Sequence, residues 1–180
     1  MDCFSTDEIL RLLQAAKDHR KDAWLLLTIT FLHGLRSSEA VGLTPDNVVG
    51  HTLTVKRCKR SRPVRHELVE HENPLLDERK ALLELVRKTP RNQKLFPITE
   101  RTFQRWVHKY GKVAGLSEIA SHPHTLKHSI LTHLSETMKI PELQDYSGHK
   151  SMGSLGIYLH PKPEQVRSAV RKALGGIVSN

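Results

Sequence analysis

The sequence predicts a mainly α-helical domain with a small antiparallel β-sheet, an α+β fold. Apolar residues recur at helical spacing over most of the 180 residues, whereas alternation with a period of two is confined to 52–56 and 64–69. No internal repeat, low-complexity segment or linker divides the chain, whose length suits one ordinary domain. We therefore expect one domain over residues 1–180, with its core between about 5 and 174.

The first part of the chain predicts three helices. Ser5 is a hydroxyl N-cap followed by two acids, and apolar residues then recur at helical spacing from Ile9 onward. A second helix is predicted over 22–33, and its almost entirely apolar middle predicts a place at the centre of the core. Gly34 ends that helix, and a short third helix is expected over 35–43.

The alternating stretches at 52–56 and 64–69 predict two antiparallel strands joined by a strongly basic turn. Lys59 lies at the tip of this turn, flanked by Arg57, Arg60 and Arg62. A lysine on a hairpin tip can reach into a groove or donate a proton to a leaving group. The plain alternative is a solvated charged turn.

The rest of the chain predicts further helices. One should run from Pro74 to Val86, and the next should begin at 99–102 with its apolar residues on one face and basic residues on the others. Helices are also expected over 125–138, 141–146, 151–158 and 163–174. The helix that begins at 99–102 carries the basic residues Arg101, Arg105 and Lys109.

Composition points to a polyanionic partner. The chain has 28 Lys and Arg against 19 Asp and Glu, a formal charge of +9, and nucleic acid is the first candidate for such a balance. A merely soluble basic protein would have the same charge. Cys3 and Cys58 alone argue against a disulfide framework and fit a reducing cytoplasm, and the sequence contains neither an apolar span nor a signal segment.

Arg36 follows the helix break at Gly34. A guanidinium at such a break can lie beside the free N–H groups of the next helix, which is a good arrangement for binding phosphate. Glu39, three residues on, shares the helical face and can orient a neighbouring cation. A surface arginine that caps a helix is the plain alternative.

A histidine cluster opens the helix expected at 125–138. His124 and Lys127 share a helical face and can address one anion. His124 and His128 can instead bind a metal, completed by His122 or His133. Because Thr125 stands where a metalloprotease helix has its glutamate, and no carboxylate or cysteine set surrounds the histidines, we expect no metal and no cofactor.

A stretch near the C-terminus combines Gly148-His149 with Tyr158, nine positions later. Tyrosine is an uncommon nucleophile, because its phenol has a pKa near ~10 and needs help to ionise. By itself this stretch is equally well explained by a helix-ending glycine and a core tyrosine.

Together, these segments resemble the catalytic domain of the tyrosine recombinases, the phage integrase family. The matching residues are Gly34-Leu35-Arg36-Ser37-Ser38-Glu39, the hairpin Lys59 (with Lys56 as second candidate), His124 to Lys127, Ser147-Gly148-His149, and Tyr158 followed by His160. Two departures stand out: the second arginine of the family is Lys127 here, and Ser147 replaces a commoner leucine. A lysine offers a point charge where arginine offers a planar fork, so this chain can be slow or inactive.

The resemblance implies a chemistry for each residue. Tyr158 would attack a DNA phosphodiester and form a 3′-phosphotyrosyl link, with neither ATP nor a metal required. In that scheme Arg36 and Lys127 stabilise charge on the phosphate, and Lys59 is the general acid. The remaining roles fall to His124 as base toward Tyr158, His149 as hydrogen-bond partner of the phosphate, and Glu39 as support for the basic residues.

The resemblance also implies partners. The first is double-stranded DNA, and the residues expected to contact it are Arg57, Arg60, Arg62, Arg101, Arg105 and Lys109. The second is the same chain, in a tetramer on DNA in which the 163–174 segment docks on a neighbouring subunit or folds back onto its own domain. The family's separate N-terminal DNA-binding domain is absent from 1–180, and the protein would be cytoplasmic, with DNA. Three rival interpretations remain: an accessory DNA-binding protein that has lost catalysis, a histidine-rich metal-dependent hydrolase, and a helix-turn-helix regulator.

Overall fold

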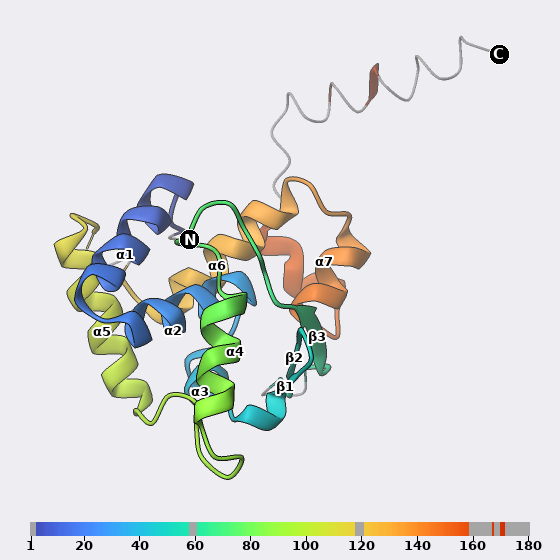
Figure 1. Cartoon of the computed structure of the whole chain (residues 1–180). Coiled ribbons are helices and arrows are strands. Elements are labelled where there is room, and N and C mark those ends of the chain that lie inside the picture. Colours follow the sequence, from blue (N-terminus) through green and yellow to red (C-terminus); the bar gives the residue numbers. More distant parts are fainter. Residues whose placement is uncertain (1–2, 58–60, 118–120, 159–166, 168–169, 172–180) are drawn as a thin grey trace.

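Helices make up most of the structure, and a small antiparallel sheet lies at one edge of it (Figure 1). The computed structural model describes residues 3–57, 61–117 and 121–158, together with Arg167, Val170 and Arg171. The α+β class predicted from the sequence is confirmed. No helix among these described residues is long and apolar enough to cross a membrane.

The elements follow one another with short connections. The helices are α1 (Thr6–His19), α2 (Lys21–Leu32), α3 (Ser37–Val41), α4 (Arg79–Lys88), α5 (Glu100–Val113), α6 (Pro123–Ser135) and α7 (Ile140–Ser147), with 3-10 turns η1 (Pro45–Asn47) and η2 (Met152–Tyr158). The strands are β1 (Val48–Val49), β2 (Thr52–Val55) and β3 (Val64–Glu67).

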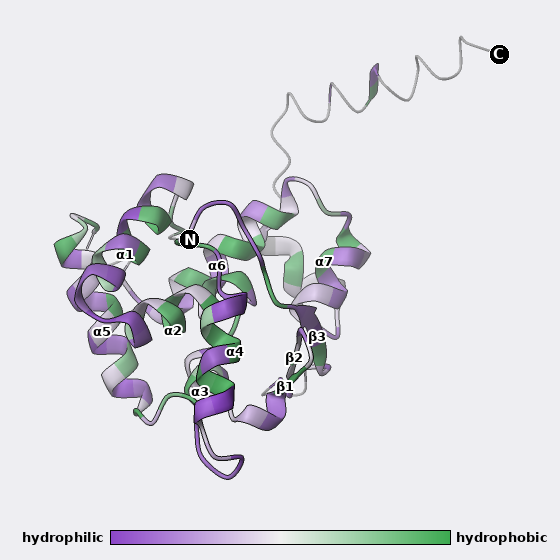
Figure 2. Ribbon diagram, in the orientation of Figure 1, coloured by the Kyte–Doolittle hydropathy of each residue, from purple (hydrophilic) through white to green (hydrophobic). Residues whose placement is uncertain are grey.

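Helix α2 occupies the centre of the core, as its apolar sequence predicted. Its residues from Ala23 to Phe31 are all buried, and the helix packs against α1 on one side and α6 on another. Figure 2 shows the apolar colouring concentrated where these helices face one another. Ser5 caps α1 in a reciprocal capping box with Glu8, which confirms the predicted start of that helix.

The three strands form one sheet in the order β1-β2-β3. Strands β2 and β3 are the predicted hairpin, paired antiparallel with Leu53 opposite His66. Strand β1 was not predicted, because two residues are too few to show an alternating pattern. The sheet therefore places the ends of the basic turn, Arg57 and Arg62, close to the helices that follow it in sequence.

The helix predicted from Pro74 is wrong at its start, because α4 begins at Arg79. Residues before it are engaged elsewhere: the carbonyl of Leu75 accepts hydrogen bonds from Trp24 and Thr28 of α2. The carboxylate of Glu78 turns inward to His33 and to the backbone N–H of Val69. These contacts with α2 and the sheet replace the first helical turn that hydrophobic spacing suggested.

The other helix predictions hold, with shifted ends. Helix α6 begins at Pro123, which suits the first turn of a helix because proline lacks an N–H. The segment predicted as a helix over 151–158 is the tighter η2. Of the predicted 163–174 helix, Arg167, Val170 and Arg171 are helical, and the remainder lies outside the described residues.

Candidate active site

Tyr158 lies at the end of η2 with its ring in the core, only 7% exposed. Its hydroxyl oxygen is 2.5 Å from Nδ1 of His128, which belongs to α6. The two rings are 5.7 Å apart and tilted by 34°. The ring of Tyr158 is therefore a core side chain, and its hydroxyl is at the same time presented to an imidazole.

The surroundings fix where the proton of this pair resides at neutral pH. Burial raises the pKa of Tyr158 to about 12, and the positive charge of Arg36 opposes that rise. Burial, followed by the charges of His124 and Lys127, lowers the pKa of His128. At neutral pH the phenol therefore keeps its proton and the imidazole is neutral.

Lys127 is a buried cation, 4% exposed. Its ammonium has no hydrogen-bond partner among the described residues. Burial, followed by the charges of Arg57 and Arg36, lowers its pKa to about 7, and the charge of Glu39 opposes that fall. Because a buried ammonium without partners is costly, the position favours an anion that would supply the missing acceptors.

Arg36 precedes α3, as predicted, and Glu39 holds it. Nη1 of Arg36 is 2.9 Å from one carboxylate oxygen of Glu39, and the backbone N–H of Arg36 donates to the other oxygen at 2.9 Å. The side chain of Arg36 is 20% exposed whereas that of Glu39 is inaccessible. The guanidinium is thus fixed by Glu39 and remains partly exposed.

Arg57 corrects one prediction from the sequence. We expected it to contact DNA from the basic turn, but its side chain is inaccessible and its guanidinium bonds inside the protein. It donates to Glu39 and to the carbonyls of Gly34 and His33, each at 2.9 Å. Arg57 therefore neutralises Glu39 and closes the carbonyl end of α2, a structural function that its place in a charged turn concealed.

The return of the hairpin lies against the glycine that ends α7. Gly148 has a left-handed backbone, φ +70°, and its carbonyl accepts a hydrogen bond from the N–H of Arg62 at 2.9 Å. A Cβ on Gly148 would come within 2.6 Å of the Arg62 carbonyl, so a residue larger than glycine would displace the hairpin. Lys59, the predicted general acid, and Arg60 lie outside the described residues.

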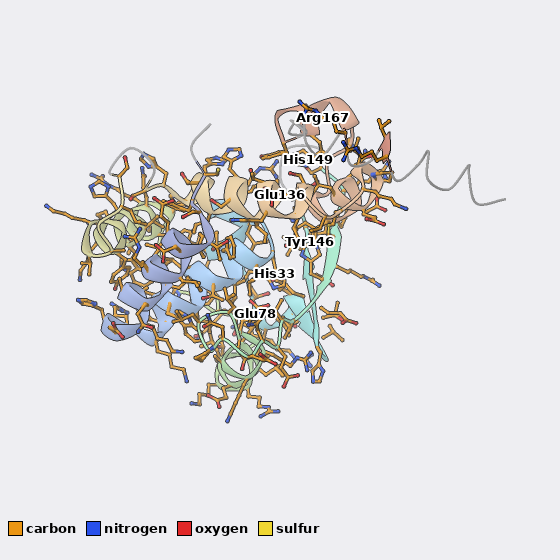
Figure 3. All side chains as sticks on the ribbon, turned by 90° about the horizontal axis from the view of Figure 1, so that it is seen from above. His33, Glu78, Glu136, Tyr146, His149 and Arg167 are labelled. Carbon is orange, nitrogen blue, oxygen red and sulfur yellow. The ribbon has the colours of Figure 1, made fainter. Side chains whose placement is uncertain are left out.

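His149 follows Gly148 and is held by Ser147. Nδ1 of His149 is 2.6 Å from the Ser147 hydroxyl, which itself donates to the carbonyl of Gln144 at 3.2 Å. The Ser147 hydroxyl therefore accepts a hydrogen bond from Nδ1–H of His149, and Nε2 of His149 is not used in this contact. Burial, then the charges of Lys127, Arg36 and Arg57, lowers the pKa of His149 to about 4. Figure 3 shows His149 beyond the buried His33 and the half-buried Tyr146.

The remaining predicted residues lie on the surface. His124 is exposed and stacks on His128, with ring centroids 6.0 Å apart. Arg62, Arg101, Arg105 and Lys109 are exposed as well. A surface pocket of about 350 Å³ is lined by Gln104, Arg105, His108, Lys109 and His122. The basic face of α5 therefore continues to the start of α6, where His124 lies.

The structure brings together Arg36, Glu39, Lys127, His149 and Tyr158. The structure adds two contacts that the sequence did not predict: His128 lies beside Tyr158, and Ser147 lies beside His149. The i, i+4 spacing of His124 and His128 was a signal, but it suggested a metal site. Among the described residues, no three His, Cys, Asp or Glu side chains are grouped to hold a metal ion.

Known proteins share this sequence pattern. The sequence model of the phage integrase family matches residues 3–165. Tyrosine recombinase XerA of Pyrococcus horikoshii is 30% identical over 177 residues, which are 93% of this chain and 59% of that protein. A tyrosine recombinase of Pseudothermotoga lettingae is 28% identical over 172 residues, again 93% and 59%. The chain thus spans about three-fifths of the length of these relatives.

Solved structures share the fold. The crystal structure of XerA recombinase superposes with a TM-score of 0.75 at 22% identity, over 96% of this chain and 65% of that one. The catalytic domain of bacteriophage HP1 integrase gives a TM-score of 0.67 at 23% identity, over 95% and 94%. XerH recombinase bound to its difH substrate gives 0.72 at 21% identity, over 93% and 53%. The arrangement of helices around the small sheet is therefore that of integrase and recombinase catalytic domains.

Proposed function

Because the chain belongs to the phage integrase family, we propose that it is the catalytic part of a site-specific DNA recombinase that cleaves and rejoins strands through a 3′-phosphotyrosyl intermediate. One observation carries this proposal most directly. The phenol of Tyr158 bonds to the imidazole of His128, and Lys127, the residue before that histidine, is buried with an ammonium that has no hydrogen-bond partner among the described residues. Attack on a phosphodiester requires a nucleophile together with cations that stabilise the phosphate.

Cleavage is a transesterification. The oxygen of Tyr158 attacks the scissile phosphorus, the bond from phosphorus to the 5′-oxygen breaks, and the protein becomes linked to the 3′-phosphate. Arg36 and Lys127 stabilise the charge that develops on the non-bridging oxygens, and Glu39 keeps Arg36 in place. A 5′-hydroxyl of a second strand then attacks the phosphotyrosine and releases Tyr158.

Proton transfers accompany both steps. The phenol loses its proton to a histidine of α6, for which the sequence predicted His124, and Lys59 of the hairpin protonates the leaving 5′-oxygen. His149 bonds a phosphate oxygen. Its Nδ1–H is used by Ser147, so the bond comes from Nε2 of the protonated ring. The negative phosphate favours that protonation because it offsets the cations that lower the pKa of His149.

Double-stranded DNA is the proposed partner. The exposed residues Arg62, Arg101, Arg105 and Lys109 lie on the hairpin end and on α5, the latter beside the start of α6. A lambda integrase fragment with the same fold is described as bound to DNA. We propose that the duplex lies across this surface with one phosphate over Tyr158, and that the 163–174 segment contacts a neighbouring subunit in a tetramer on DNA.

Covalent capture tests the proposal without knowledge of the target site. The probe is a pool of duplex oligonucleotides with randomised flanks, each nicked near its centre so that cleavage releases a short fragment and traps the phosphotyrosine. We expect a protein–DNA adduct on a denaturing gel, whose sequenced DNA reveals the preferred site. Tyr158→Phe should form no adduct yet bind the selected duplex as the unsubstituted chain does. An adduct of normal yield with Tyr158→Phe would overturn the proposal.

A further inference from the structure

We propose that His128, and not His124, is the base that removes the proton from Tyr158. This inference rests on the proposed function and deepens it, since it assigns one step of the same reaction to a different residue. It starts from the contact between the phenol oxygen and Nδ1 of His128, 2.5 Å apart. A base must lie within hydrogen-bond reach of the proton that it takes, and His128 meets that condition before any DNA is bound.

Two elements hold the pair in register. His128 lies in a part of α6 that is tied to the N-terminal segment, because the N–H of Phe4 donates to the hydroxyl of Ser129 at 2.7 Å. That hydroxyl also donates to the carbonyl of Thr125 at 2.7 Å. On the other side, the buried ring of Tyr158 is fixed by the core. Neither partner therefore depends on an exposed side chain to find the other.

His124 lies one helical turn earlier and is exposed, whereas His128 is half-buried. Its ring stacks on that of His128 with centroids 6.0 Å apart and planes at 25°. His124 is thus placed between solvent and the imidazole that touches the phenol. In this arrangement His124 faces the bound DNA and acts on Tyr158 through His128.

The proton and electrons balance without an added reagent. The O–H bond of Tyr158 breaks, its electron pair stays on oxygen and forms the bond to phosphorus, and the proton moves to Nδ1 of His128. The bond from phosphorus to the 5′-oxygen breaks, and that oxygen receives a proton from the general acid. In the reverse step His128 returns its proton to the departing Tyr158 oxygen.

The charged groups around the pair suit a base rather than a permanent cation. Lys127 and His124 on α6 oppose the protonated form of His128, and Arg36 at the start of α3 favours a negative Tyr158 oxygen. The imidazole is therefore neutral at rest, with Nδ1 free of a proton and Nε2 carrying one. The transfer is completed only as negative charge passes from the tyrosine oxygen to the phosphate.

The test compares three matched substitutions on α6 with the selected nicked duplex. His128→Asn keeps an acceptor oxygen near the position of Nδ1 but cannot take the proton, so the adduct rate should fall by about 10²-fold or more. With His124→Asn the adduct rate should fall by less than tenfold. His133→Asn is the control, and its adduct rate should match that of the unsubstituted chain. A rate for His128→Asn near that of the unsubstituted chain, or a larger loss with His124→Asn, overturns the assignment.

A second substrate separates the base from the acid. A 5′-bridging phosphorothiolate has a thiolate leaving group that needs no proton, so the defect of His128→Asn should persist with it. Restoration of the rate by this substrate would place His128 at the leaving group and overturn the proposal. No adduct with the unsubstituted chain would instead contradict the proposed function itself.

A measurement on the folded chain covers the case in which His128→Asn does not fold. In long-range ¹H–¹⁵N spectra at neutral pH, one imidazole should have an unprotonated Nδ1 whose resonance shifts when Tyr158 is replaced by Phe. Removal of a single hydroxyl leaves the rest of the ring in place. If no such Nδ1 resonance shifts, the contact does not exist in solution and the inference fails.

Discussion

Two tyrosines of this protein, Tyr146 and Tyr158, each lie beside a histidine, but the pairs are built differently. The ring of Tyr146 stacks flat on His66 with centroids 4.3 Å apart, and its hydroxyl donates to the backbone carbonyl of Leu32. The ring of Tyr158 is tilted from His128, whose Nδ1 points at the hydroxyl. Burial raises the pKa of both tyrosines.

The partner of the hydroxyl decides what each tyrosine can do. A backbone carbonyl accepts a hydrogen bond but cannot take a proton, so Tyr146 is anchored and unreactive. An imidazole can take the proton, so Tyr158 can attack once a phosphate is present, although burial raises its pKa as well. A buried tyrosine and a nearby histidine therefore do not by themselves indicate a nucleophile.

The polar groups around the two tyrosines differ as well. Nε2 of His66 lies 2.9 Å from the Tyr146 carbonyl, which accepts its N–H, and Nδ1 of His66 lies 3.1 Å from Nδ1 of His33. Nε2 of His33 is in turn 2.5 Å from the Glu78 carboxylate. Figure 3 shows Glu78, His33 and Tyr146 one after another across the molecule. This network joins α2, β3, α4 and α7 internally, whereas the ammonium of Lys127 on α6 lacks a partner among the described residues.

The largest effect should come from Lys127→Met, which removes that ammonium at similar volume. If Lys127 binds the scissile phosphate, the rate of adduct formation should fall by about 10²-fold or more. Stability should rise or stay constant, because a buried charge without a partner is removed. The rate is measured by gel and the free energy of unfolding by denaturant. Loss of stability with an unchanged rate would show that Lys127 supports the fold instead.

Lys127→Arg should act in the opposite direction. A planar guanidinium can hold two phosphate oxygens at once, so we expect the adduct rate to rise by about tenfold. The same nicked duplex measures it, with Lys109→Arg on the surface of α5 as the matched control. An unchanged or lower rate would mean that the buried site is already adapted to lysine.

Tyr146→Phe should have the converse profile to Tyr158→Phe. It leaves the Leu32 carbonyl without its donor, which should lower the free energy of unfolding by about 1–3 kcal/mol. The adduct rate should change by less than about threefold, since the ring still stacks on His66. A loss of adduct as complete as that of Tyr158→Phe would erase the distinction between the two tyrosines.

The last prediction concerns the stability of the folded chain in acid. Burial lowers the pKa of His66 and of His149 to about 4, against 6.5 for a free imidazole. Between those values the unfolded chain binds protons that the folded chain does not, so stability should fall as pH falls from about 6.5 to 4. Denaturant unfolding at pH 7 and 4.5 should show this loss of stability, and His66→Gln should reduce it. A stability that rises toward pH 4.5 would contradict both shifts.

Local patterns accounted for much of the fold and for part of the site. Helices α1, α2 and α5 follow from apolar spacing and caps, and Glu39 meets Arg36 because three residues on a helix share a face. The start of α4 could not be predicted, since the bonds that hold Leu75 and Glu78 come from α2, β3 and the end of the sheet. The chemical roles of Arg36, Lys127, His149 and Tyr158 stay predictions.

The amino-acid sequence by itself determined the α+β class and the family to which the chain belongs, and it predicted the tyrosine and basic residues of the site, because these depend on spacing along the chain. Only the tertiary structure decided which buried cation has partners. Arg57 and Lys127 are both buried, but Arg57 is paired with Glu39 and donates to two carbonyls, whereas the ammonium of Lys127 has no hydrogen-bond partner among the described residues. It also decided that His128 meets Tyr158, since 30 residues separate them and only the packing of η2 on α6 brings them together.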